Sequence, residues 1–234
     1  MKVIGLGDTH GRVRWKIIVS NNEDADKLVF IGDYFDTHGN VTPEQQINNF
    51  KDIIAFKRDN MNKVILLIGN HDYHYMTGVD ETYSGYNEEY AKDINIILEE
   101  ALSENLLQMC FVSDNYVFTH AGITNTWANA NNIDVNVNGL ENSINNLFKT
   151  NRGAFKFTPN RLGFGSNSGN DITQTPIWVR LPSLDMDIIP NVVCVVGHTP
   201  QKAIDVRHNI IAIDTLGISD EYLIIENSIP KVGN

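Results

Sequence analysis

Residues 64–72 read Val64-Ile-Leu-Leu-Ile-Gly-Asn-His-Asp72, an apolar run that ends in a glycine and three polar side chains. A short aliphatic run of this kind is typical of a buried strand. In open α/β sheets the carboxyl ends of the strands converge on one crevice, where ligands bind. The stretch therefore predicts a buried strand that delivers Asn70 and His71 to a site.

Four other apolar runs end in the same way, each just before a carboxylate or an imidazole. They are Val3 to Leu6 before Asp8 and His10, Leu28 to Ile31 before Asp33 and Asp36, Tyr116 to Thr119 before His120, and Val192 to Val196 before His198. A lone Gly-Asp after a strand is most often an ordinary turn. Five such endings in one chain indicate a shared site instead.

The remaining patterns alternate between helices and strands. Thr42-Pro43, with Gln45 in the capping-box position, predicts the start of a helix, and a broad apolar face predicts a second helix over about 88–102. The last third is rich in strands, including Ile210 to Ile213 and Tyr222 to Ile225. These patterns predict an α/β fold with mixed sheets.

The domain organisation follows from the absence of a long linker, so we expect residues 1–234 to form a single domain. Within it, the segment 123–176 is rich in Asn and Gly, and Gly163 to Asn170 reads as an irregular loop. We expect this segment to be an irregular cap or loop region, which either covers the site or is mobile.

Composition excludes several classes of protein. The chain has 234 residues with 42% hydrophobic and 20% charged, which suits one sizeable core. Its formal charge of −11 argues against stable binding of nucleic acid or of an anionic membrane. Its apolar runs are too short to cross a bilayer, and Asp8 comes too early for a signal peptide. The separated Cys110 and Cys194 predict no disulfide, so we expect a cytoplasmic protein.

The side chains at the five strand ends suit metal ions. Oxygen and imidazole ligands together favour manganese, iron or zinc, whereas calcium and magnesium seldom use three histidines. One carboxylate of the set could bridge two ions, and the glycines beside the ligands would let the backbone turn sharply and leave room for an anion. The plausible ligands for two divalent ions are Asp8, His10, Asp33, Asn70, His120 and His198.

The order of these motifs resembles the calcineurin-like metallophosphoesterases. The family signature is Gly-Asp-x-His-Gly, Gly-Asp-x-x-Asp, Gly-Asn-His-(Asp/Glu) and two further histidines, and this chain has all five parts between Asp8 and His198. The runs 69–74 and 120–127 look like the branch of bacterial or phage Ser/Thr phosphatases and diadenosine tetraphosphate hydrolases. The resemblance implies two mixed β-sheets packed as a sandwich and flanked by helices.

The resemblance also implies a role for each residue. One metal would be held by Asp8, His10 and Asp33, and the second by Asp33, Asn70, His120 and His198. His71 would be the general acid, Asp36 would orient it, and Arg180 in Pro176-Ile-Trp-Val-Arg180 would clamp the phosphoryl oxygens. Two divalent ions, with manganese first and iron or zinc as alternatives, would bind the hydroxide that attacks phosphorus.

Some positions depart from the family or have no assigned role. Thr37 and Tyr73-His74 stand where eukaryotic-type protein phosphatases carry arginines that grip phosphate, so Arg180 is the first candidate for that contact. Arg12 and Arg152 are weaker candidates for the phosphate contact, and we leave His38 and His74 outside the site. The tyrosines 73, 75, 83, 86 and 90 could stack an adenine, although such residues more often serve packing, and we interpret Asp214 as structural.

We therefore expect a bimetal phosphoesterase that acts on a phosphorylated small molecule, nucleotide or phosphoprotein. A phosphomonoesterase similar to protein Ser/Thr phosphatases is the first hypothesis, and a dinucleoside polyphosphate hydrolase is the alternative. A non-catalytic metal-binding module is disfavoured because the ligands and the general acid are all present. A nuclease is disfavoured by the acidic composition.

Overall fold

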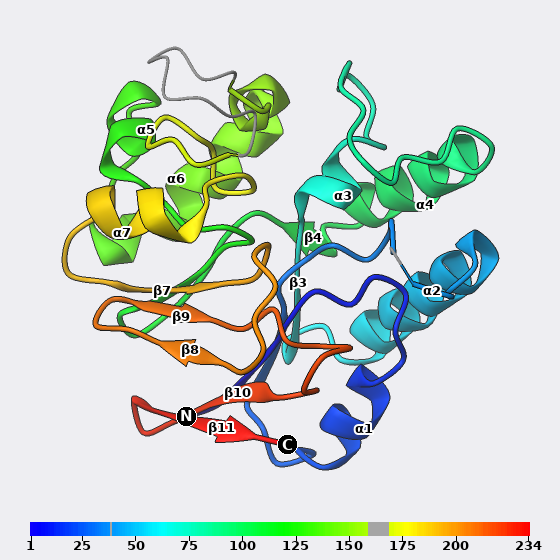
Figure 1. The fold of residues 1–234 in the computed structure, drawn as a ribbon, viewed down its shortest axis with the longest axis horizontal. Coiled ribbons are helices and arrows are strands. Elements are labelled where there is room, and N and C mark those ends of the chain that lie inside the picture. The colour runs from blue at the N-terminus through cyan, green and yellow to red at the C-terminus, as the bar shows by residue number, and fades with distance from the viewer. Residues whose placement is uncertain (38, 159–168) are drawn as a thin grey trace.

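Two mixed β-sheets form the centre of the molecule (Figure 1). The computed structural model describes residues 1–37, 39–158 and 169–234, so His38 and most of the predicted loop from Gly163 to Asn170 lie outside the described residues. The first sheet contains, in spatial order, β11 (Ile229–Gly233), β10 (Tyr222–Glu226), β1 (Lys2–Leu6), β2 (Lys27–Phe30), β3 (Val64–Leu67) and β4 (Leu107–Gln108). The second contains β5 (Phe111–Ser113), β6 (Tyr116–Phe118), β7 (Val193–Val196), β9 (Ile210–Ala212) and β8 (Asp205–Val206).

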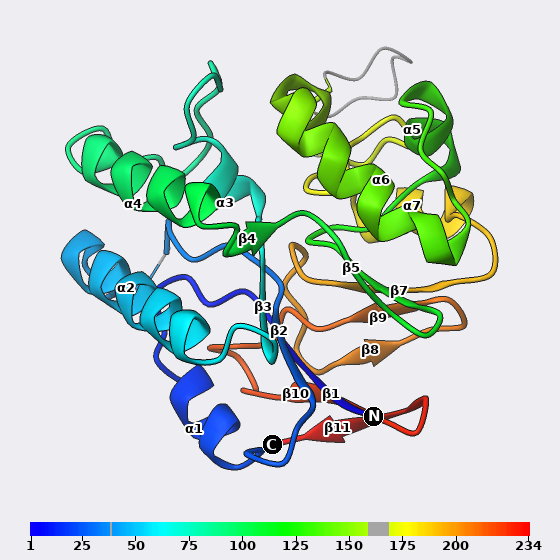
Figure 2. The ribbon, with the colours of Figure 1, turned by 180° about the vertical axis from the view of Figure 1, so that it is seen from behind.

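Helices cover the outer face of each sheet (Figures 1 and 2). The first sheet is flanked by α1 (Trp15–Ser20), α2 (Pro43–Asp59) and α4 (Ala91–Ser103), and the second by α5 (Asn125–Ala130), α6 (Val137–Thr150) and α7 (Leu181–Asp187). The short α3 (Asn70–Tyr73) and a 3₁₀ turn at Arg152–Phe155 complete the described helices. Among the described residues, every helix is too short or too polar to traverse a bilayer.

Successive side chains along each strand point to opposite faces, and they form two hydrophobic layers, one between the sheets and one under the helices. Val3 from the first sheet and Phe118 and Val195 from the second belong to one buried cluster between the sheets. The next residues along the strands, such as Ile4 and Leu28, belong to the cluster that packs against the helices. Because successive side chains point to opposite faces, a central strand that is buried on both faces must be apolar throughout. The predicted sandwich of two mixed sheets flanked by helices is therefore confirmed.

All seven predicted strands are present, each within one residue of its predicted bounds. The four strands that the sequence did not predict are β4, β5, β8 and β11, and each is an edge strand of its sheet. Edge strands are short and partly exposed, so they carry no continuous apolar run. β11, for example, has no fully buried residue.

The two predicted helices are also present. α2 begins at Pro43 behind a complete capping box between Thr42 and Gln45. α4 begins at Ala91 rather than near 88, because the side chain of Asn87 accepts hydrogen bonds from the two N–H groups that precede the helix. Such a local turn competes with the first helical turn.

The prediction that segment 123–176 is irregular was wrong for α5 and α6. Thr124 caps α5 by accepting the N–H of Trp127, and Asn136 caps α6. Leu140, Ile144 and Phe148 form the buried stripe of α6 at helical spacing. The many Asn residues hide this stripe in the sequence, because the buried residues of α6 recur only at every fourth position.

Asn145 connects α6 to the two residues that join β4 to β5. Its Oδ1 accepts the N–H groups of Met109 and Cys110 at 2.9 and 3.0 Å, and its Nδ2 donates to the carbonyl oxygen of Cys110 at 2.9 Å. Met109 and Cys110 are both fully buried. A buried N–H that loses its partner costs free energy.

We therefore expect Asn145→Ala to lower the free energy of unfolding by about 2 kcal/mol, because it leaves these buried groups without a partner. Urea denaturation followed by circular dichroism measures the change. Asn146→Ala on the exposed face of α6 is the matched control and should have almost no effect. Equal losses in the two variants would contradict this role of Asn145.

Candidate functional site

The five predicted strand endings meet at one edge of the sandwich. Strands β1, β2 and β3 run parallel in the first sheet, and β6 and β7 run parallel in the second. Asp8, His10 and Asp33 offer ligand atoms within 4.8 Å of one another, and so do Asp33, His120 and His198. Asp33 is thus common to two groups of metal-ligating side chains.

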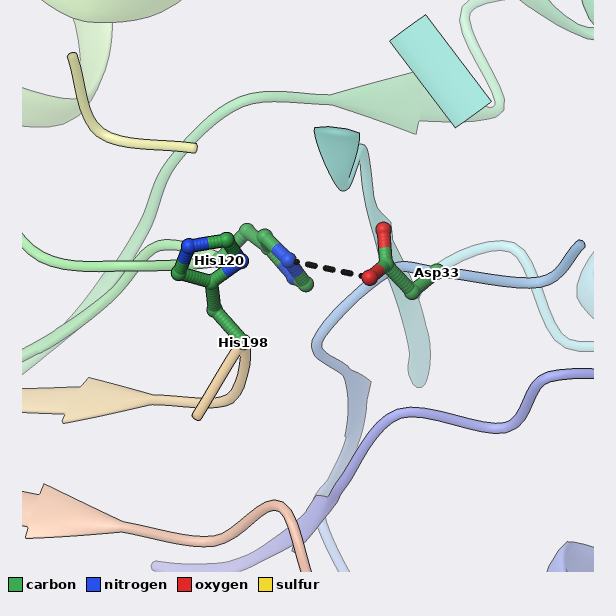
Figure 3. A group of neighbouring side chains, drawn as sticks. All are labelled: Asp33, His120 and His198. Carbon is green, nitrogen blue, oxygen red and sulfur yellow. Dashed lines mark ion pairs between the residues drawn. The ribbon is translucent and has the colours of Figure 1, made fainter. Parts of the chain in front are cut away.

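Asp33 faces His120 across a short gap (Figure 3). Its Oδ2 is 3.3 Å from Nε2 of His120 and 3.8 Å from Nε2 of His10, and Figure 3 shows His198 beside His120 on the far side of the gap. Its Oδ1 accepts the backbone N–H of His71 at 2.9 Å. One carboxylate oxygen is therefore held by the backbone, while the other faces imidazoles from two directions.

Backbone carbonyls orient all three imidazoles. A carbonyl oxygen can only accept, so the ring nitrogen that faces it carries the proton, and the other ring nitrogen of the neutral imidazole has a lone pair for a metal. The ring-to-carbonyl pairs are His10 Nδ1 to Phe35 at 2.6 Å, His120 Nδ1 to Ile31 at 2.9 Å, and His198 Nε2 to Trp178 at 3.1 Å.

The donor set fits a cation. Oδ1 of Asn70 is 3.1 Å from Nε2 of His120, which also faces Asp33. Lone pairs on Oδ1 of Asn70, Nε2 of His120 and Oδ2 of Asp33 thus face one another. Because they repel, a positive charge among them would stabilise the arrangement. Asp8 adds an oxygen, because its Oδ2 accepts the N–H of His198 at 3.0 Å whereas its buried Oδ1 has no hydrogen-bond partner among the described residues. A buried oxygen without a partner is costly unless a cation binds it.

The pKa shifts of Asp8 and Asp33 also indicate a cation site. Burial raises the pKa of Asp8 well above its ordinary value, and Asp214 and Asp33 add to the rise. Burial alone would also raise the pKa of Asp33, but the positive charge that His120 and His71 carry when protonated outweighs it and lowers that pKa well below the usual value. Buried acidic groups with opposed shifts are typical of functional sites.

Four residues of this region have a left-handed backbone. The φ angles are +44° at His10, +55° at Asp33, +61° at Asp36 and +63° at His198. Such angles are uncommon for residues other than glycine, and they concentrate at functional sites where the surroundings impose them. Three of the four residues, His10, Asp33 and His198, belong to the two groups of metal-ligating side chains.

Two glycines leave space for the carboxylates. A Cβ on Gly69 would lie 2.1 Å from Oδ1 of Asp33, and one on Gly197 would lie 2.0 Å from Oδ1 of Asp8. The sequence interpretation allotted this space to a substrate anion. In the structure the ligands themselves occupy it, so any side chain at these positions would displace Asp33 or Asp8.

His71 and Asp36 form a pair at the open side of the site. Nδ1 of His71 is 3.0 Å from Oδ2 of Asp36, so the other ring nitrogen remains for a substrate. The side chains of His71 and His10 are 15% and 18% exposed, whereas His120 is fully buried. The rings of His71 and His10 are in edge-to-face contact, with centroids 5.5 Å apart. These two partly exposed imidazoles therefore mark the side of the ligand groups that solvent reaches.

Arg180 and Arg12 both lie near the candidate ligands: the charge of Arg180 acts on Asp33 and Asp8, and that of Arg12 acts on His10. Nη1 of Arg180 donates to the carbonyl oxygen of His198 at 2.7 Å. Arg152 lies elsewhere, where it forms a two-point pair with Glu99 at 2.7 and 3.1 Å. Arg12 is packed against Gly217, and its charge acts on Asp214.

Sequence reasoning missed three buried residues around the ligands. Asp72 accepts the N–H groups of Gly69, Asp33 and Tyr34, and so joins the ends of β2 and β3. Asp214 is buried beside Asp8, and burial together with Asp33 raises the pKa of Asp214 to about 6. His74 contacts Asp36 at 2.6 Å. Asp72 is part of the Gly-Asn-His-Asp motif in the sequence. The sequence does not show, however, which backbone N–H groups its carboxylate accepts.

Comparison with known protein families identifies the family of this chain. The family model described as calcineurin-like phosphoesterase matches residues 1–202, a range that includes every strand ending of the site. No match was found among curated proteins. Among solved structures, Yfce, a phosphoesterase from E. coli, is 16% identical, with 98% of this chain and 91% of that chain covered and a TM-score of 0.38. The family match, over most of the chain, shows that this protein belongs to the calcineurin-like phosphoesterases and is a metal-dependent hydrolase of phosphate esters.

Proposed function

We propose that the protein is a phosphomonoesterase similar to protein Ser/Thr phosphatases. The observation that carries the proposal is the position of Asp33, whose carboxylate belongs to two groups of ligands at once. Asp8, His10 and Asp33 would hold one divalent ion, and Asp33, Asn70, His120 and His198 the second. When bound, two such ions turn a shared water into the attacking hydroxide at neutral pH.

The remaining site residues act on the substrate. His71 donates a proton from Nε2 to the departing oxygen, and Asp36 holds the ring by its Nδ1. Arg180 places a fixed positive charge beside the ligands, where the extra negative charge of a phosphomonoester would lie. The donor set, with three imidazoles, supports Mn²⁺ first, with iron or zinc as the alternatives.

The surroundings support a single domain in the cytoplasm. One buried cluster includes residues from Ile4 to Tyr222, so we infer that residues 1–234 form one domain, with 123–176 as its cap. Cys110 and Cys194 are both buried and unpaired, which suits a reducing compartment. The net charge of −11 supports a phosphorylated small molecule, nucleotide or phosphoprotein as the partner, rather than a nucleic acid or a membrane.

A dinucleoside polyphosphate is the second candidate substrate. A cavity of about 690 Å³ adjoins the first ligand motif at Gly11, and Arg12 and Arg14 line it. A space of that size fits a ligand such as a nucleoside. Two arginines next to the site could hold the additional phosphates of such a substrate.

A series of substrates distinguishes a phosphomonoesterase from a dinucleoside polyphosphate hydrolase. We expect the Mn²⁺-loaded protein to hydrolyse nitrophenyl phosphate and a phosphothreonine peptide faster, by kcat/KM, than the nitrophenyl diester or diadenosine tetraphosphate. Faster hydrolysis of diadenosine tetraphosphate would replace the first proposal by the second. Stoichiometric metal binding without any hydrolysis would contradict both and favour a binding module.

Removing the shared ligand should remove both ions. Loss of a residue that only orients a ligand costs about 10- to 100-fold in metal affinity. We therefore expect Asp33→Asn to weaken Mn²⁺ binding by more than about 100-fold at both sites, as measured by metal analysis after gel filtration. Asp52→Asn, on the exposed face of α2, is the control. Retention of two ions by Asp33→Asn would exclude Asp33 as the bridge.

The general acid should matter most for poor leaving groups. We expect His71→Ala to reduce kcat about 100- to 10,000-fold for an alkyl phosphate and much less for nitrophenyl phosphate, because nitrophenolate leaves without a proton. Steady-state kinetics on the two esters gives the ratio, and His208→Ala, an exposed histidine, is the control. An equal loss on both esters would contradict proton donation by His71.

A further inference from the structure

Asp36 is the centre of a second cluster, next to the ligands but not part of either ligand group. Its Oδ2 is 3.0 Å from Nδ1 of His71 and 2.6 Å from Nε2 of His74, and its Oδ1 accepts the hydroxyl hydrogen of Tyr75 at 2.6 Å. His71 and His74 reach the same oxygen because residues three apart lie on one side of a helical turn. The proposed mechanism uses only the pair of His71 and Asp36.

The protonation of His74 follows from its other partner. Its Nδ1 accepts the backbone N–H of Tyr83 at 3.2 Å, so Nδ1 has the lone pair and Nε2 carries the proton of the neutral ring. That proton is therefore on the nitrogen that contacts Asp36. The contact is short, although the N–H bond is not aimed directly at Oδ2.

Aromatic rings fix the position of His74. Its side chain is fully buried. Tyr83 stacks on the ring with centroids 5.3 Å apart, and Tyr75 and Tyr86 meet its edges at 4.4 and 5.1 Å. Within this enclosure the ring cannot turn without displacing its neighbours, so the Nε2 atom stays in contact with Oδ2 of Asp36.

The segment 77–90 holds this cluster against the site. Gly85 packs so closely that a Cβ there would lie 2.8 Å from Cβ of Asp36, and its φ is +94°. The N–H of Asn87 donates to the hydroxyl oxygen of Tyr75 at 2.9 Å. Asp36 is thus covered by its own segment and by 77–90, and it is only 5% exposed.

We propose that His74 is a positioning residue for proton transfer: it fixes Asp36, which in turn holds the ring of His71 toward the leaving group. The proposal rests on the proposed function of His71 as the general acid. His74 is not a member of either ligand group. It contacts the carboxylate of Asp36 and meets the ring of His71 edge to face, with centroids 5.7 Å apart, so both contacts bear on the position of His71. Small displacements of a catalytic group cost up to about 100-fold in rate, so an unfixed Asp36 would slow catalysis without removing metal.

Two substitutions distinguish the roles of the two ring nitrogens of His74. The amide nitrogen of glutamine reaches the place of Nε2, so His74→Gln keeps a donor for Asp36. The amide of asparagine reaches only the place of Nδ1, so His74→Asn keeps the partner of Tyr83 and loses the contact with Asp36. We expect His74→Asn to lower kcat for an alkyl phosphate about 10- to 100-fold, less for nitrophenyl phosphate, while His74→Gln stays within a few fold of the parent.

The same substitution in a His71→Ala background makes the test specific. If His74 acts through His71, His74→Asn should have no further effect on kcat once the general acid is absent. Metal content should stay at the parental value in every His74 variant. The exposed His208→Asn is the matched control and should resemble the parent.

Each outcome has a separate meaning. Parental activity of His74→Asn on both esters would overturn the role of His74 and leave the proposed function intact. Equal losses on both esters that persist in the His71→Ala background would also overturn it, since they would indicate a purely structural residue. Absence of phosphoesterase activity in the parent, or an equal effect of His71→Ala on both esters, would instead contradict the proposed function.

Discussion

The site depends on keeping one carboxylate, that of Asp33, buried among imidazoles. With 2% of its surface exposed, Asp33 can stay ionised only because positive groups and N–H donors surround it. The backbone holds Oδ1, Asp72 holds the N–H of Asp33, and Gly69 leaves room for the carboxylate. Oδ2 is then the atom that faces both ligand groups. Cations bound by these two groups would offset a buried negative charge that solvent does not reach.

This constraint also joins the two sheets. Asp8, Asp33 and Asn70 follow strands of the first sheet, whereas His120 and His198 follow strands of the second. Neither sheet alone contains a complete second ligand group, so the packing of the sandwich assembles the site. The apolar cluster between the sheets fixes their distance, and Asp8 accepts an N–H from the turn after β7 across that boundary. Packing and site geometry are thus linked.

Strand positions were predictable because they are local, and so were the candidate ligands that follow the strands and that the structure brings together. A central strand must be apolar on both faces, and the ligand follows it directly, as in Ile68-Gly69-Asn70. The edge strands were not predicted because they are partly exposed and so lack a continuous apolar run. Helix α6 was not predicted because its buried apolar residues are few and are separated by Asn residues. His74 and Asp72 were missed for another reason. Their roles are defined by partners such as Asp36 and the N–H of Tyr34, which are distant in the sequence.

By itself, the sequence determined that five buried strands end in carboxylate, amide or imidazole groups, because hydrophobic periodicity and side-chain chemistry are properties of neighbouring residues. The tertiary structure alone decided that Oδ2 of Asp33 faces two directions, that carbonyls orient each imidazole, and that His74 and Asp36 are in contact. Hydrogen bonds and electrostatic contacts act over a few ångströms. Only the folded chain brings residues from separate strands within that range, so no pattern along the chain encodes these contacts in readable form.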